Sequence, residues 1–222
     1  MKKKWRRNFS EWNAPAVREC FGLVRQQESP VFLDWLGARF EQPAAYAPLI
    51  EHLRGELFNL VNNWNEIELL ARFIAPVLAT IGFDGPGYSQ FHGRTLAFDL
   101  ARVGKVSGSV DGLVAKGEAE PEIPMFFLHE YKKSQGYDAD PEGQLLIAMI
   151  AAQRLNADGQ PLYGCYVVGS YWRFVLLEGQ TYSVSQGYDA TDAGELRIIW
   201  SVLVHTKQLI EERVKLILDS EL

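Results

Sequence analysis

The chain has 222 residues, of which 47% are hydrophobic and 12% aromatic, a composition well outside the range of disordered proteins. Its 22 basic and 28 acidic residues give a net charge of −6. This balance argues against a basic nucleic-acid coat protein, but not against a nucleic-acid enzyme whose metal site needs carboxylates. Cys20 and Cys165 are too few and too far apart for a disulfide framework or a zinc site. We expect two buried free thiols in a reducing cytoplasm.

The N-terminus is basic, with five basic residues among the first seven and Trp5 between them. No apolar stretch follows, so this tip does not look like a secretory signal, and no run reaches the ~18 apolar residues of a membrane span. The tip is either a phosphate contact in which Trp5 stacks on a base or a solvated, frayed terminus, and the second interpretation is favoured. We expect a cytoplasmic protein without membrane contact.

The first third of the chain predicts helices. Apolar residues recur at spacings of three and four over residues 14–28, 30–40 and 44–62, and Pro30 suits the first turn of its helix. No ligand pattern is present in this part. We therefore expect a helical extension over residues 1–63 that packs on the main domain or on a partner chain, such as a second copy in a homodimer.

A further helix is predicted from Asn65 to Thr80. Asn65 is a suitable N-cap, and Glu66 and Glu68 fall in the first turn, where the helix dipole favours acidic side chains. Pro76 lies inside this pattern and is expected to kink the helix or to end it early.

The remainder predicts a sheet and two more helices. The expected strands cover residues 95–102, 106–115, 123–131, 162–168, 172–177 and 182–184, and the expected helices cover residues 142–156 and 192–218. The helix at 142–156 is apolar on nearly all sides, which is typical of a buried helix. This order predicts an α/β fold with a mixed sheet covered by helices, in a domain over residues 64–222.

The most informative segment is the end of the third expected strand, where Glu130 and Lys132 follow an apolar run. Side chains alternate along a strand, so these two share a face, and a carboxylate beside an ammonium in such a place must be paired or hold a metal. Asp111 is an isolated acid on the preceding strand. These two carboxylates and the backbone carbonyl of Tyr131 are hard oxygen ligands suited to Mg²⁺. Lys132 then orients or activates a water and stabilises charge on a phosphate.

Each of these residues also has a purely structural interpretation. Glu130 and Lys132 can form an ion pair, Asp111 can cap the turn at Gly112, and Glu66 needs no role beyond the start of its helix. His129 is expected on the opposite face from Glu130, as a packed histidine rather than a ligand.

The order of a helix acid, a strand Asp and a Glu-x-Lys on the next strand resembles the PD-(D/E)XK nuclease superfamily. The resemblance covers roughly residues 64–186. Residues 65–84 are also similar to the opening of the N-terminal nuclease domain of type I restriction enzymes. The resemblance implies a restriction-endonuclease-like mixed sheet flanked by helices. The absence of any helicase motif excludes a complete type I motor.

The resemblance also implies a role for each site residue. Asp111 corresponds to the metal-binding Asp, although Val110 replaces the proline that often precedes it. Glu130 corresponds to the second metal ligand and Lys132 to the catalytic lysine.

Two further positions of the family pattern have matches. Glu66 corresponds to the helix acid, which also contributes to the metal site, with Glu68 as its rival. Gln144 falls at the start of the next helix, where the family often places a polar residue close to the site.

These residues together predict a Mg²⁺-dependent nuclease that acts on DNA, with Mn²⁺ as a possible substitute metal. The first alternative is a module of the same fold that binds nucleic acid or a protein without cutting, for which we expect an exposed apolar patch on residues 14–62. The second is another phosphate-ester hydrolase that uses the same carboxylates on free nucleotides.

Overall fold

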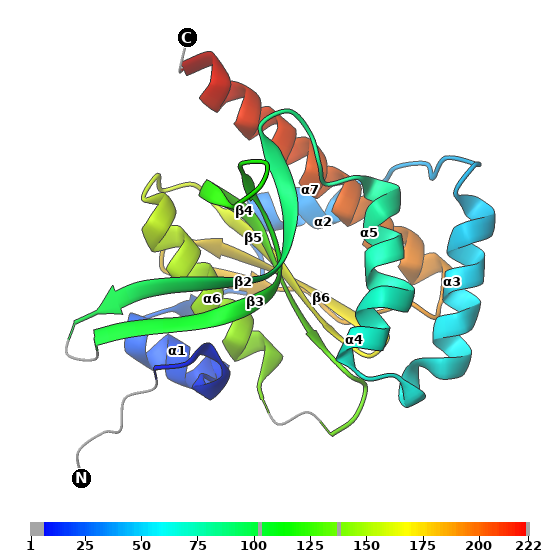
Figure 1. The fold of residues 1–222 in the computed structure, drawn as a ribbon, viewed down its shortest axis with the longest axis horizontal. Coiled ribbons are helices and arrows are strands. Elements are labelled where there is room, and N and C mark those ends of the chain that lie inside the picture. The colour runs from blue at the N-terminus through cyan, green and yellow to red at the C-terminus, as the bar shows by residue number, and fades with distance from the viewer. Residues whose placement is uncertain (1–6, 102–103, 137–138, 221–222) are drawn as a thin grey trace.

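A computed structural model describes residues 7–101, 104–136 and 139–220, and within them eight strands form one mixed sheet (Figure 1). The strands are β1 (Val24–Arg25), β2 (Tyr88–Leu100), β3 (Gly104–Lys116), β4 (Glu122–Lys132), β5 (Leu162–Val168), β6 (Tyr171–Glu178), β7 (Thr181–Val184) and β8 (Tyr188–Asp189). Their spatial order is β1-β7-β6-β5-β4-β3-β2, and β8 pairs with β6. The pairs β4–β5 and β1–β7 are parallel, whereas the other neighbours are antiparallel.

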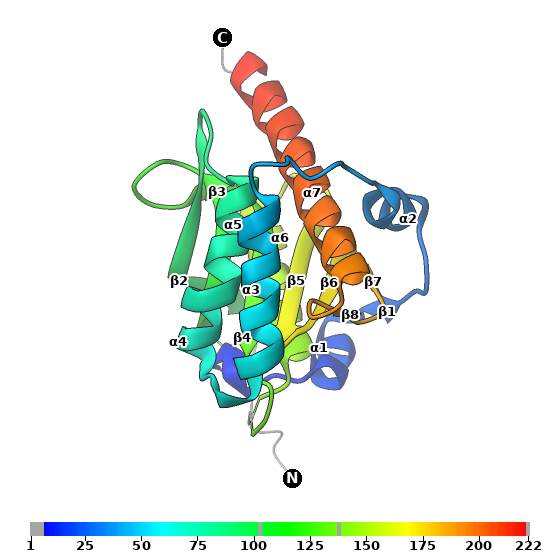
Figure 2. The ribbon, with the colours of Figure 1, turned by 90° about the vertical axis from the view of Figure 1, so that its right-hand side faces the viewer.

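Helices cover both faces of this sheet (Figure 2). One face carries α2 (Pro30–Gly37), α3 (Ala47–Leu60), α4 (Glu66–Leu69), α5 (Ala75–Ile81) and α7 (Ala193–Ser220), and the other carries η1 (Phe9–Glu11), α1 (Ala14–Phe21) and α6 (Pro141–Asn156). Two short segments, η2 (Val61–Asn63) and the π-helical η3 (Leu70–Ile74), complete the described helices. Each layer encloses its own hydrophobic cluster against the sheet. The predicted α/β architecture, with helices at the N-terminus, is confirmed.

The N-terminal segment departs from its prediction in one place. The helix expected over residues 14–28 ends at Phe21, because Gly22 adopts a left-handed conformation with φ +67° and caps it. The chain then forms β1, which pairs in parallel with β7 and leaves Val24 exposed. Residues before position 64 thus contribute both to the sheet and to the two clusters.

The sheet has two features that the periodicity did not indicate. β2 begins at Tyr88 rather than at Thr95, because its polar first half forms a ladder with β3 even though it buries few side chains. The two-residue strand β8 is too short to leave a sequence pattern. The expected strand end at Arg102, and Val103 in the following turn, lie outside the described residues.

Pro76 does not end its helix. The helical backbone continues from Glu66 to Ile81, with Pro76 in the first turn of α5 directly after the π-helical η3. A proline lacks an N–H and cannot make the usual interior hydrogen bond, so the irregular stretch next to it is physically reasonable.

Two minor predictions have mixed outcomes. Cys20 and Cys165 are not joined in a disulfide, but only Cys165 is buried, whereas Cys20 lies on the surface. Within the described part of the chain, no helix is both long and apolar enough to cross a membrane. The basic tip, apart from Arg7, lies outside the described residues.

The contact between the N-terminal segment and α6 supports a prediction on stability. A Cβ at Gly143 would lie 2.4 Å from the Cα of Asn13, whereas a Cβ at Gly55 of α3 would meet no atom within 4 Å. We expect Gly143→Ala to lower the free energy of unfolding by about 2 kcal/mol or more through overpacking. Gly55→Ala is the matched control and should raise that free energy by roughly 0.5–1 kcal/mol, because alanine favours the helix. Urea unfolding of both variants measures the two changes. Equal effects would contradict close packing at Gly143.

Candidate active site

The candidate site lies where the sheet forks between β3 and β4. Their antiparallel ladder runs from Lys116 and Glu122 up to the pair Gly112 and His129 and stops there. Beyond this point β3 stays with β2, whereas β4 continues with β5 through Lys132. Figure 1 shows the β2–β3 hairpin extending away from the rest of the sheet. The fork leaves backbone groups of β4 without a strand partner on one side.

Asp111 occupies the first position after the last ladder pair. Its Oδ2 accepts a hydrogen bond of 2.7 Å from the backbone N–H of Tyr131. The carboxylate thereby replaces the ladder bond that the divergence removes. A carboxylate offers about four lone-pair positions, so Asp111 keeps acceptor capacity for a ligand.

Glu130 and Lys132 form a close pair at the end of β4. Lys132 Nζ donates to Glu130 Oε1 over 2.6 Å, and both residues are buried, with exposures of 8% and 3%. In the parallel ladder with β5, Lys132 lies opposite Val168 and Glu130 lies opposite Tyr166. Tyr166 packs in the cluster that contains α6, so this pair lies on the α6 face. The two side chains share one face, as the strand alternation predicted.

The start of α4 decides between the two rival helix acids. Asn65 caps the helix by accepting from the Glu68 N–H, and Glu68 Oε2 accepts from the Asn65 N–H in return. The carboxylate of Glu68 is therefore engaged in the capping box. Glu66 Oε1 lies 3.9 Å from Lys132 Nζ, and its side chain is 46% exposed. The helix acid that reaches the site is Glu66.

The electrostatics show that the carboxylates are crowded. Burial, and next the nearby charge of Asp111, raise the pKa of Glu130 to about 8, although Lys132 partly offsets them. Burial also raises the pKa of Asp111, against the hydrogen bond from Tyr131. Burial alone would lower the pKa of Lys132, but the attraction of Glu130 raises it. A cation near both carboxylates would relieve this unfavourable arrangement.

These residues provide donors that suit Mg²⁺. Mg²⁺ is usually bound through one or two carboxylates and keeps several waters, and Asp111, Glu130 and the Tyr131 carbonyl offer such a set. Among the described residues, no group of three or more His, Cys, Asp or Glu side chains is arranged to hold a metal. Glu66 as a metal ligand thus stays a prediction, and its contact here is with Lys132.

The structure does not connect Gln144 to the other four predicted residues. Gln144 is 8% exposed in the first turn of α6, and its Oε1 has no hydrogen-bond partner among the described residues.

His129 lies on the face opposite Glu130, where burial lowers its pKa to about 3 and its Nδ1 is 2.6 Å from the Tyr131 hydroxyl. This contact fits the expected packed histidine.

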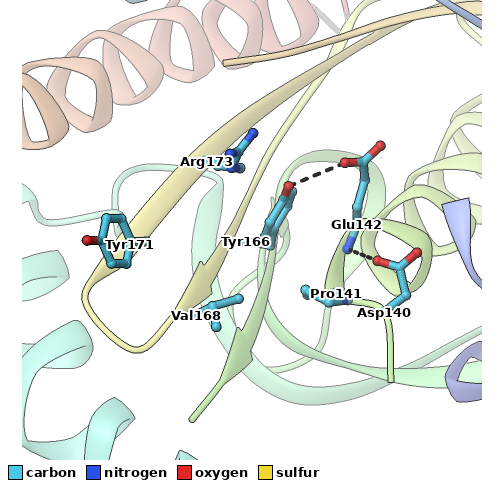
Figure 3. A pocket seen from close by; sticks show the side chains of 7 residues that line it. All are labelled: Asp140, Pro141, Glu142, Tyr166, Val168, Tyr171 and Arg173. Carbon is cyan, nitrogen blue, oxygen red and sulfur yellow. Dashed lines mark hydrogen bonds between the residues drawn. The ribbon is translucent and has the colours of Figure 1, made fainter. Parts of the chain in front are cut away.

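A pocket of about 430 Å³ lies on the α6 face, one strand away from Glu130 and Lys132, and the sequence did not single out its lining (Figure 3). Tyr166 and Val168 of β5 form its middle, between β6 and the start of α6. The only signal in the sequence that could have indicated this lining is that Tyr171 and Arg173 alternate with buried residues on β6.

His92 is an exposed residue on β2, and its Nδ1 lies 3.1 Å from the Asp111 carbonyl oxygen.

The fold and site together define an α/β protein with a forked mixed sheet that carries an acidic, lysine-containing cluster. No family model matches the chain, and no curated protein matches it. Among solved structures, it is similar to a chain of the DrdV–DNA complex determined by cryo-electron microscopy, with 15% identity and a TM-score of 0.38. The match covers 71% of this chain but only 14% of that one.

Proposed function

We propose that this protein is a metal-dependent nuclease that hydrolyses phosphodiester bonds in DNA and belongs with the PD-(D/E)XK nucleases. The observation that carries the proposal is the fork in the sheet. It brings Asp111, Glu130 and Lys132 together on one side, with Glu66 from α4 next to Lys132. Asp111 is a second carboxylate that disfavours the charged form of Glu130. If Glu130 and Lys132 formed only a structural ion pair, the presence of Asp111 beside them would have no explanation.

Each residue has a chemical role in this proposal. Asp111, Glu130 and the Tyr131 carbonyl would hold Mg²⁺ or Mn²⁺. When bound, the metal supplies Lewis-acid stabilisation of charge on the phosphate and on the leaving oxygen. Lys132, an ammonium at neutral pH, donates hydrogen bonds to an attacking water or to a phosphate oxygen. Glu66 is partly exposed beside this ammonium and restrains its position.

The chain as a whole is acidic, so binding of DNA requires groups near the site that attract its phosphates. Lys133 and Ser134 directly follow the site and line a pocket of about 310 Å³ together with Asn62, Asn65 and Glu68, whose carboxylate is engaged in the capping box. Hydrogen-bond donors of this kind commonly contact the phosphate backbone of nucleic acids. We propose that the residues lining this pocket contact the DNA backbone next to the site.

The test is cleavage of supercoiled, linear and single-stranded DNA with Mg²⁺ or Mn²⁺. We expect cutting that EDTA abolishes completely and that added metal restores, because the buried carboxylates need the cation to bind a phosphate. Cutting that persists in excess EDTA would contradict the metal-dependent mechanism. DNA binding without cutting under any metal would favour the alternative of a non-cleaving module. Activity on free nucleotides alone would favour another phosphate-ester hydrolase.

The homodimer remains a prediction. The N-terminal helices do expose large apolar side chains, namely Val31, Leu33, Leu49 and Phe58. Nothing among the described residues shows what covers them.

A further inference from the structure

We infer that the pocket between α6, β5 and β6 binds one unpaired nucleotide of the DNA strand next to the cleaved phosphate. This inference rests on the proposed function for its substrate class, and it adds a substrate form: DNA with a single-stranded segment at the site. It is carried by the position of the pocket, by its aromatic wall and by the opposite charges of its two sides (Figure 3).

The position follows from the strand register. Val168, which lines the pocket, lies opposite Lys132, and Tyr166 lies opposite Glu130. Neighbouring strands are roughly 5 Å apart, and paired residues point to the same face of the sheet. The pocket therefore begins one strand away from the catalytic pair and opens on the same side.

One wall comes from β6 and suits a base and its phosphate. Tyr171 is 55% exposed, which is unusual for so large a side chain in the sheet. Figure 3 shows its hydroxyl directed away from Glu142, so the ring is the part that the pocket can use. Aromatic rings of this kind are the usual stacking surface for unpaired bases.

Arg173 lies two residues further along the same strand and faces the same side. Its Nη1 donates to the Ser185 carbonyl at 3.3 Å, which fixes the guanidinium and leaves most of its five N–H groups for a ligand. A fixed guanidinium is well suited to a phosphate oxygen.

The opposite wall is acidic and comes from the first turn of α6. Glu142 accepts from the Tyr166 hydroxyl at 3.3 Å and from the Tyr182 hydroxyl at 3.2 Å, so its carboxylate is held in place. Asp140 beside it accepts from the N–H groups of Ala14 and Glu142. Two carboxylates repel a phosphate, so this wall must face the base rather than the backbone. Carboxylates accept hydrogen bonds from exocyclic amino groups, such as N4 of cytosine.

The aromatic wall argues against an intact duplex as the occupant. In a duplex both faces of each base are stacked, so Tyr171 could not stack on a base there, although a carboxylate can still reach N4 of a paired cytosine from the major groove. A volume of about 430 Å³ lies at the small end of ligand pockets, which fits a single nucleotide. The ligand is thus one unpaired nucleotide whose base carries an amino group.

The test measures binding in EDTA, so it does not depend on cleavage. Fluorescence anisotropy with labelled single-stranded oligonucleotides compares wild type with Tyr171→Ala. We expect Tyr171→Ala to weaken binding roughly tenfold, which is the usual contribution of one stacked base to affinity. Tyr171→Phe keeps the ring and should bind within about twofold of wild type. Tyr46→Ala removes another exposed tyrosine, at the start of α3, and should change nothing. Affinity for a blunt duplex should be equal in all four proteins.

A second comparison tests the acidic wall. Wild type should bind an oligo-dC more tightly than an oligo-dT, and Glu142→Gln should reduce this preference, because an amide is a weaker acceptor than a carboxylate. The inference is overturned if wild type does not bind single strands, if Tyr171→Ala binds them as wild type does, or if no preference for oligo-dC exists. The proposed nuclease function can survive each of these results, since it is tested by metal-dependent cutting and by Lys132.

Discussion

Replacing Lys132 with methionine is expected to reduce the rate of metal-dependent DNA cleavage about a thousandfold, the usual effect of removing a group that stabilises transition-state charge. Methionine fills much the same space but cannot donate to a water or a phosphate. Lys132 is buried and its Nζ lies 2.6 Å from Glu130 Oε1, so its ammonium is held at the site. Single-turnover cleavage of supercoiled DNA measures the loss.

This result must be separated from unfolding, because the substitution leaves Glu130 without its partner. The pKa of Glu130 already stands at about 8, so the carboxyl can bind a proton instead of remaining charged. We expect the melting temperature to fall by less than about 8 °C, which corresponds to roughly 2 kcal/mol in a chain of this size. Lys215→Met, on the exposed side of α7, is the matched control and should cut as wild type does. A folded Lys132→Met protein that cuts at the normal rate would falsify the proposed mechanism.

Replacing Asp111 with asparagine is expected to weaken Mn²⁺ binding at least about a hundredfold, since metal sites lose 10- to 100-fold even when only an outer partner is removed. The asparagine side chain keeps an oxygen that can accept from the Tyr131 N–H, so the fork should persist. Only the negative charge is lost. Calorimetric titration with Mn²⁺ measures the affinity, and cleavage should fall in parallel.

A suitable control for this variant lies on the same hairpin. Asp99 of β2 is exposed, and Asp99→Asn removes the same charge at a distance from the fork. It should leave both Mn²⁺ affinity and cleavage unchanged. If Asp111→Asn binds Mn²⁺ as tightly as wild type, Asp111 is a structural acceptor for Tyr131 and not a metal ligand.

Local chemistry made several elements predictable. Asn65 before two glutamates indicated a helix start, and Asn65 is the N-cap of α4. Asp140, followed by Pro141, caps α6 in the same way. These signals depend only on backbone groups within one turn, so they survive in any tertiary setting. The alternation of a strand likewise predicted that Glu130 and Lys132 share a face, and their 2.6 Å contact confirms it.

Other features depend on partners far away in the chain. Two acids stand in the first turn of α4; the local spacing of Asn65 and Glu68 already allows the capping box, but only the assembled structure shows that Glu66 reaches Lys132. The strand at Val24–Arg25 exists because β7, more than 150 residues later, offers an edge to pair with. No local pattern contains that information.

The sequence by itself therefore determined which chemistry the chain can carry: isolated carboxylates and a lysine on neighbouring apolar strands, and an acid at a capped helix start. Only the tertiary structure decided where these groups meet. The divergence of β3 from β4 lets Asp111 take over the Tyr131 amide, and the β5–β6 pairing brings Tyr171 and Arg173 to the pocket that begins one strand away from Lys132. The physical reason is that caps and strand alternation are set by a few neighbouring residues, whereas forks and pockets arise from pairings between segments that the chain order does not bring together.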